Sequence, residues 1–211
     1  MGKVATLSGR QERTEITRAR LIQSAEKIFA RDGFEAAKLE EIAADAGYTR
    51  GAFYANFDSK EDLFFALLES EIGSRIGALE REIDRVQEAE AKLKAMRDFF
   101  LTKTMDRRWC LLALEFKLFA VRHPEVRQRL AAMHRRLVGP RVGFVEEVMK
   151  RVGAELPVSA YATGVSMEAL GNSLTLEHML DPTMITESDV RHIEGNFFDS
   201  LTSLPKKKAA K

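Results

Sequence analysis

The sequence has little cysteine and proline and almost no net charge. Its one cysteine, Cys110, excludes a disulfide framework and a cysteine-based zinc finger, and is typical of a reducing, intracellular compartment. Five prolines and thirteen glycines are too few to punctuate a β-rich fold of 211 residues. The 33 basic and 32 acidic side chains nearly cancel, so contact with nucleic acid would have to come from a local arrangement of charges.

Long apolar runs are also missing. No stretch reaches the length of a membrane span, and residues 1–10 lack the apolar segment of a signal peptide. We therefore expect a cytoplasmic protein that does not enter a membrane. Apolar residues make up 45% of the chain and charged residues 31%, a balance that permits a packed core.

The apolar residues follow helical spacing along the whole chain, and alternation with period two persists nowhere, which predicts an all-α fold of about nine helices. The polar residues 1–16 are expected to form a flexible arm. A first helix is expected from about Thr17 to a glycine C-cap at Gly33. Two short helices, 39–46 and 50–57, precede a long fourth helix that follows Asp58 and Ser59.

Beyond residue 88 the expected helices are richer in large apolar side chains. Asp106 is expected to cap one of them, and Thr186 with Asp189 forms a variant of the capping box before the last. Pro140 falls inside a helix over residues 125–151 and should kink or split it. A lysine-rich tail, 205–211, is expected to be disordered.

Two short helices joined by a tight, glycine-containing turn at residues 47–48 form the unit of a helix-turn-helix. On the second of them, Phe53 and Phe57 share one side and are expected to be buried. The opposite side carries mostly small residues: Gly51, Ala52, Tyr54 and Ala55. Small side chains let a helix backbone approach base edges closely, so this side is the predicted DNA-reading surface.

Three polar residues flank that surface. Thr49 occupies the N-cap position, where its hydroxyl and the free amides after it can face a phosphate. Arg50 can reach either a phosphate or a guanine. Lys60 opens the fourth helix and can clamp the DNA backbone from the other side.

These residues resemble a known family. The stretch from Ala19 to Ser70 is similar to the DNA-binding region of the TetR family of bacterial regulators. The resemblance is carried, at the family's spacing and without gaps, by Phe29, Gly33, Phe34, Ile42, Ala43, Ala46, Gly47, Gly51, Tyr54, Phe57, Ser59, Lys60, Glu61 and Leu63. It covers about the first third of the chain.

The resemblance implies a three-helix DNA-binding head over 17–59 and a larger ligand-binding and dimerisation domain over 60–204. A small ligand would spread the two heads of a homodimer and release double-stranded operator DNA. The implied DNA contacts are Thr49, Arg50, Gly51, Ala52, Tyr54, Asn56 and Lys60, with Phe53 and Phe57 in the core.

The sequence departs from the family at two places. Where the family usually has a Thr or Ser pair before the second helix, this chain has Ala37 and Lys38. The capping hydroxyl is lost, but Lys38 can bind a phosphate as a point charge. Asn56 replaces a frequent His, so an amide donor to phosphate is expected without pH dependence.

Large apolar side chains at helical spacing either line a ligand cavity or pack as ordinary core. Given the resemblance, we expect a cavity for an apolar or amphipathic small molecule. The residues expected to line it are Phe99, Met105, Trp109, Leu112, Phe116, Phe144 and Met167.

The last two helices combine small residues with an apolar terminal face. We expect them to pair with their symmetry mates in a four-helix dimer interface; the alternative is packing within one chain. The residues expected in this interface are Gly164, Ala169, Gly171, Ser173, Phe197, Phe198 and Leu201.

The sequence thus favours a homodimeric repressor released from a palindromic operator by a small molecule. One alternative is a regulator or activator that ignores small molecules. A helical enzyme is the other, but it needs a convergent set of acid, base or nucleophile residues, and we find none. The four histidines show no metal spacing, so neither metal nor cofactor is expected.

Overall fold

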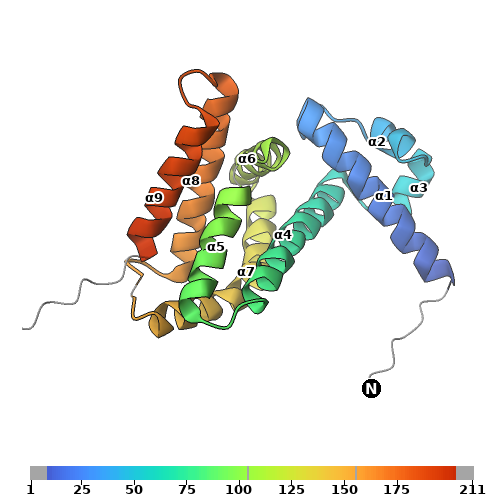
Figure 1. The fold of residues 1–211 in the computed structure, drawn as a ribbon. Helices are drawn as coiled ribbons and strands as arrows, with labels where there is room; N and C mark the ends of the chain where they lie inside the picture. The colour runs from blue at the N-terminus through green and yellow to red at the C-terminus, as the bar shows by residue number, and fades with distance from the viewer. Residues whose placement is uncertain (1–8, 104, 155, 203–211) are drawn as a thin grey trace, which may run out of the picture. The chain divides into compact units, whose positions relative to one another are not determined.

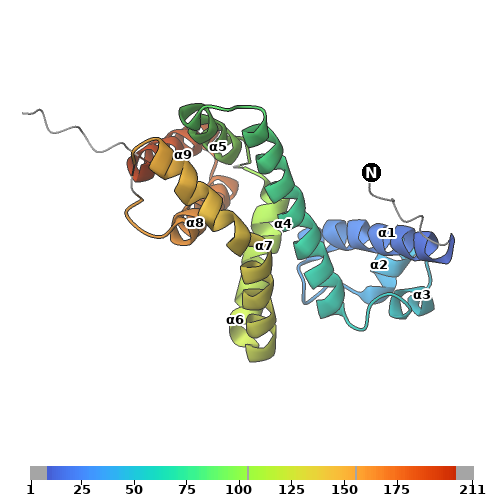
Figure 2. The same ribbon diagram turned by 90° about the horizontal axis from the view of Figure 1, so that it is seen from below.

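The structure, a computed structural model, describes residues 9–103, 105–154 and 156–202, which form α-helices and no strand (Figures 1 and 2). The all-α fold is therefore confirmed over this part of the chain. In chain order the helices are α1 (Gly9–Asp32), α2 (Leu39–Asp45), α3 (Arg50–Tyr54), α4 (Lys60–Asp84), α5 (Ala89–Lys103), α6 (Arg107–Arg122), α7 (Pro124–Arg151), α8 (Ala160–Leu180) and α9 (Glu187–Thr202).

The chain divides into two compact units, Met1–Glu71 and Ile72–Lys211. This boundary lies inside α4, later than the boundary after residue 59 that the sequence suggested. The reason is that the first turns of α4 place Leu63, Phe64 and Leu67 in the core of the N-terminal unit, where all three are buried. A contiguous helix can serve two cores, so its first residue need not be a domain boundary.

Helix α1 begins at Gly9, not near Thr17, so residues 9–16 of the expected arm are helical. Thr17 lies in the helix interior, where its hydroxyl donates to the carbonyl of Arg13 at 2.9 Å, four residues back. The rest of the arm, 1–8, and the basic tail, 205–211, lie outside the described residues.

The core of the N-terminal unit is built around aromatic rings. The apolar stripe predicted on α1, Leu21, Ala25, Ile28 and Phe29, is buried. Phe29 contacts Phe34 and Phe64 with ring centroids 5.5 and 4.9 Å apart, and Phe34 meets Phe64 edge-on at 5.1 Å. Gly33 ends α1 with a φ of 80°, as the C-cap prediction required.

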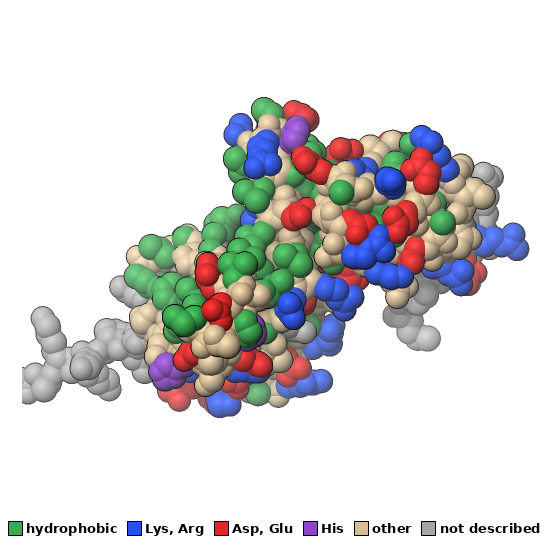
Figure 3. Space-filling model, turned by 90° about the horizontal axis from the view of Figure 1, so that it is seen from above, with side chains coloured by type: hydrophobic (Ala, Val, Ile, Leu, Met, Phe, Trp, Pro, Cys, Tyr) green, Lys and Arg blue, Asp and Glu red, His purple; other side chains and the backbone are tan. Residues whose placement is uncertain are grey.

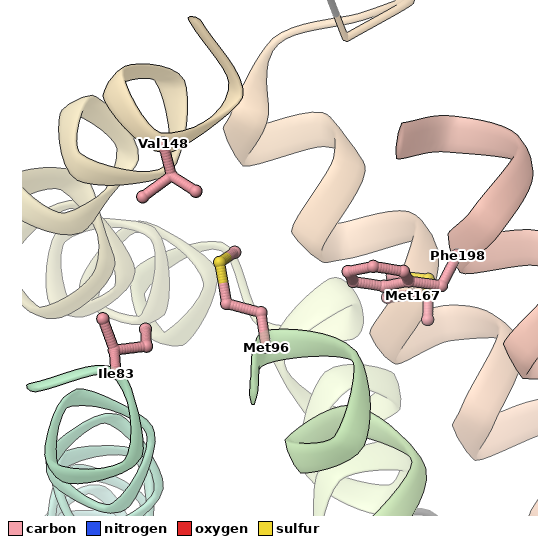
Figure 4. Packing of buried hydrophobic residues seen from close by; sticks show 5 residues of the cluster. All are labelled: Ile83, Met96, Val148, Met167 and Phe198. Carbon is pink, nitrogen blue, oxygen red and sulfur yellow. The ribbon is translucent and has the colours of Figure 1, made fainter. Parts of the chain in front are cut away.

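The C-terminal unit has its own apolar centre (Figure 4). Five buried side chains from five different helices, α4, α5, α7, α8 and α9, form one cluster: Ile83, Met96, Val148, Met167 and Phe198. Phe197 and Leu201 pack against it from α9. Because each helix contributes one side chain, the cluster fixes these helices to one another.

The packing of α8 against α9 involves part of the predicted dimer interface, which stays a prediction. The two helices lie side by side within one chain (Figures 1 and 2). A Cβ on Gly171 would come within 2.5 Å of Oε1 of Glu194, which is only 2% exposed. Gly171 has no side chain, so the large residue Glu194 on α9 of the same chain can approach it closely. Three residues of α9 also pack within the chain, in or against the apolar cluster: Phe197, Phe198 and Leu201. Gly164, Ala169 and Ser173 do not share this role, since a Cβ on Gly164 meets nothing within 4 Å and the other two are exposed.

The predicted helix caps are confirmed. Asp106 accepts from the backbone N–H of Trp109 at 3.1 Å, and Thr186 and Asp189 exchange backbone N–H bonds at 2.9 and 3.2 Å. Helix α7 runs unbroken past Pro140, so this proline does not split it. None of the helices in the described ranges is long and apolar enough to cross a membrane.

The contact between Gly171 and Glu194 generates a stability prediction. Gly171→Ala should lower the free energy of unfolding by about 1–2 kcal/mol, because a buried carboxylate must shift to admit the methyl group. The matched control is Gly143→Ala in α7, where a Cβ meets nothing within 4 Å. The control should raise the stability by about 0.5–1 kcal/mol through helix propensity alone. Urea unfolding followed by circular dichroism measures both, and equal gains would contradict the close approach of α8 and α9.

Candidate nucleic-acid interface

Helices α2 and α3 form the predicted helix-turn-helix. Ile42 and Ala43 are buried on the inner side of α2. Gly47 has a φ of 79° in the turn, and the backbone N–H of Tyr48 closes the turn on the carbonyl of Ala43 at 2.8 Å. A left-handed residue is needed there, which explains the glycine. Helix α3 ends at Tyr54, before the predicted Phe57, although the Phe57 N–H still bonds to the carbonyl of Phe53 at 2.9 Å.

Side chains from outside α3 hold it in place. Phe53 and Phe57 are 0% and 4% exposed, as the sequence predicted. The guanidinium of Arg18, on α1, lies 4.2 Å from the centre of the Phe57 ring and donates to the carbonyl of Asn56 just beyond α3. The role of Arg18 was not predicted from the sequence, because an arginine on the polar side of an amphipathic helix gives no local indication of which residues it will contact.

The opposite side of α3 faces away from the protein core. Thr49 is the N-cap, and its hydroxyl accepts from the backbone N–H of Ala52 at 3.3 Å. Gly51 is exposed, and the Tyr54 ring is 46% exposed while packing edge-on against Phe53 at 5.3 Å. The structure thus brings together Thr49, Arg50, Gly51 and Tyr54 on one surface that another molecule can reach.

Arg50 lies within a small polar network on this surface. Its Nη1 is 2.8 Å from Oε1 of Glu40 on α2, and its Nη2 is 3.5 Å from the Tyr54 hydroxyl. Its guanidinium carbon also lies 5.6 Å from the centre of the Tyr54 ring. The bond to Tyr54 and the negative charge of Glu40 both raise the pKa of Arg50, which remains cationic. Glu40 was not among the residues predicted from the sequence.

Two predicted phosphate donors have other roles. The Asn56 amide donates to the carbonyl of Ala52 at 2.8 Å, so it caps α3 instead of pointing outward. Lys60 donates to the carbonyls of Glu35 and Ala37 at 2.9 and 3.2 Å, and its ammonium lies 4.8 Å from the Phe34 ring centre. Burial lowers the pKa of Lys60. Both donors thus bind protein backbone carbonyls here, and their contacts with phosphate stay predictions.

Lys38 remains available. It occupies the N-cap position of α2 and makes no side-chain capping bond, which confirms that the capping hydroxyl is missing there. Its side chain is exposed, whereas Ala37 beside it is buried. The cation predicted to meet a phosphate thus lies exposed at the start of α2.

The residues predicted to line a ligand cavity are spread over several environments in the C-terminal unit. Leu112, Phe116 and Met167 are buried. Trp109 lies under the guanidinium of Arg75 at 4.5 Å, and Arg75 also pairs with Asp106. The ring of Phe99 is half-buried. Met105 has a φ of 72°. The ring of Phe144 is exposed and lies beside Lys92. In the described part of the chain no three His, Cys, Asp or Glu side chains are grouped to hold a metal ion.

Comparison with known proteins relates residues of the N-terminal unit to one family. Residues 21–67 match the family described as bacterial regulatory proteins, tetR family. The regulator TtgR of Pseudomonas putida is 43% identical over 60 residues, which are 28% of this chain and 29% of TtgR. Such alignments cover 19% of one curated relative and 52% of another, so the chain matches only part of their lengths.

Solved structures extend the similarity of fold to most of the chain. A putative TetR-family regulator from Rhodococcus sp. has a TM-score of 0.71 and 19% identity, with 90% of this chain and all of that chain (100%) covered. The regulator FadR from Bacillus subtilis, in complex with stearoyl-CoA, has a TM-score of 0.67 and 18% identity over 88% of this chain and 97% of that one. At these identities the comparison establishes the fold alone.

The two lysines near α2 and α4 give a stability prediction. Lys60→Met should lower the free energy of unfolding by about 1 kcal/mol, because two loop carbonyls lose a charged donor. Lys38→Met is the matched control and should change it by less than about 0.5 kcal/mol, as expected for an exposed site. Thermal unfolding compares the two, and equal effects would contradict the structural role of Lys60.

Proposed function

The N-terminal unit of this chain belongs to the tetR family of bacterial regulatory proteins, and from that premise we propose that the protein is a transcriptional regulator that binds operator DNA through α3. The observation that carries the proposal is the exposed side of α3, where Arg50, Gly51 and Tyr54 are exposed, together with the exposed cation Lys38 at the start of α2. Small residues allow close approach to base edges, and flanking cations neutralise phosphates.

We propose that two copies act together. Because the whole chain has a net charge of only +1, one copy has little general attraction for DNA, so affinity should depend on two heads that engage a palindromic site. Support comes from α8, where Tyr161, Val165 and Leu180 are 41%, 43% and 71% exposed. Tyr161, Val165 and the exposed Ala169 follow one another at steps of four residues, and Leu180 follows Ala169 after eleven residues. These spacings place all four on one side of the helix.

An exposed apolar stripe of this kind is best covered by a symmetry mate. Figure 3 shows hydrophobic side chains gathered over part of the surface of the C-terminal unit. Ile193 of α9 adds a further exposed apolar side chain. We therefore propose that the outer sides of α8 and α9 form the four-helix interface. Of the interface residues predicted from the sequence, this surface includes Gly164, Ala169 and Ser173.

A small ligand would regulate this dimer. The solved FadR structure of the same fold holds stearoyl-CoA. We propose that an apolar or amphipathic molecule binds in the C-terminal unit beside the half-buried residues Phe99, Met105 and Trp109. Such a ligand shifts the dimer only through its differential affinity for the DNA-bound and released forms. The proposed regulator is thus a cytoplasmic repressor without catalytic activity.

Binding of purified protein to DNA from upstream of its own gene tests the proposal. Tyr54→Ala should weaken binding about tenfold, because a ring at the centre of the contact surface is removed. Tyr54→Phe separates the hydroxyl from the ring and should weaken binding less. Fluorescence anisotropy at two salt concentrations measures these affinities. Unchanged affinity in Tyr54→Ala, with the fold intact by circular dichroism, would contradict the assigned surface.

The dimer interface has its own test. Val165→Glu on the outer side of α8 should convert a dimer into a monomer at micromolar concentration, because a carboxylate would be buried without a partner. Leu118→Glu, at an exposed apolar position of α6, is the matched control and should leave a dimer. Analytical ultracentrifugation distinguishes the two forms. A monomer produced by Leu118→Glu alone would place the interface on α6.

A further inference from the structure

Arg50 is held from two directions. Glu40, the second residue of α2, meets Nη1 of Arg50 at 2.8 Å. Tyr54, one turn along α3, faces Nη2 at 3.5 Å. The two partners belong to different helices, so the position of the guanidinium depends on the packing of α2 against α3.

We propose that Glu40 is a specificity-determining residue that holds Arg50 in position to bind one guanine in each half-site of the DNA. This inference rests on the proposed function, since it names the base that the α3 surface recognises. Glu40 itself does not contact a base. It acts through Arg50 and is therefore a positioning residue for that contact.

The charge of Glu40 favours a base over a phosphate as the target of Arg50. A phosphate bound by this guanidinium would lie close to a carboxylate of the same sign, and the repulsion would weaken the contact. A guanine offers two neutral acceptors in the major groove, O6 and N7, which a carboxylate does not repel in this way. The choice between phosphate and guanine that the sequence leaves open is thus decided by a neighbour on another helix.

The geometry leaves Arg50 able to make that contact. A guanidinium has five N–H donors in one plane, and Glu40 and Tyr54 face only two of its three nitrogens, each of which carries a second N–H. The side chains of Arg50 and Glu40 are 61% and 57% exposed, so incoming DNA can reach the remaining donors. An exposed ion pair adds little to stability, so its main effect is to restrict the orientations of the guanidinium.

The adjacent Glu41 supplies a matched control. Its carboxylate pairs with Arg31 of α1 at 2.6 Å, away from the ion pair between Glu40 and Arg50. Arg31 is also paired with Asp32, so loss of Glu41 leaves it a partner. Glu40→Gln and Glu41→Gln therefore remove the same charge from neighbouring exposed positions of one helix, but only the first removes the partner of Arg50.

The experiment selects binding sites from a library of randomised DNA duplexes, using the full-length wild-type protein and the variants Arg50→Ala, Glu40→Gln and Glu41→Gln. Arg50→Ala should lose the preference for guanine at one position of each half-site. Glu40→Gln should reduce that same preference about threefold, while its affinity for unrelated DNA rises because a negative charge is gone. Glu41→Gln should retain the wild-type preference.

A double variant separates orientation from simple charge. In the Arg50→Ala background, Glu40→Gln should have no further effect on base preference. If Glu40→Gln strengthens binding to all sequences by the same factor as Glu41→Gln and keeps the guanine preference, the inference is wrong and the proposed function stands. If the wild-type protein selects no sequence, the proposed function fails and the inference fails with it.

Discussion

The burial of Phe53 and Phe57 is the constraint on which the DNA-facing surface depends. Helix α3 has five residues, too few to be stable in water on its own. It persists because one side is packed into the aromatic core of the N-terminal unit, where Phe53 is fully buried. The orientation of this buried side determines which residues face outward, so the core selects the recognition surface.

Polar side chains around α3 divide into two groups with different tasks. Arg18 and Lys60 donate to backbone carbonyls and hold the ends of α3 and α4. Lys38 and Arg50 are exposed and can contact another molecule. A nearly neutral chain can bind DNA only through a few exposed cations, and we propose that Lys38 and Arg50 serve this purpose.

Local patterns predicted the elements better than the partners. The stripe on α1, the glycine at position 47 and the capping residue Asp106 each depend on neighbours within a few residues, and each was predicted correctly. The position of Gly171 was recognised as a close approach, but periodicity cannot tell whether the neighbour is the same chain or a second copy. The partners of Lys60 could not be predicted, because they are loop carbonyls brought near only by tertiary packing.

We propose that two copies of α3 recognise DNA at sites related by two-fold symmetry. Hydroxyl-radical footprinting of the purified protein on its own upstream region tests this symmetry. Two protected segments are expected, separated by about one helical turn, and both should disappear together when one half-site is replaced. A single protected segment that survives this replacement, or uniform protection that shows no sequence preference, would contradict it.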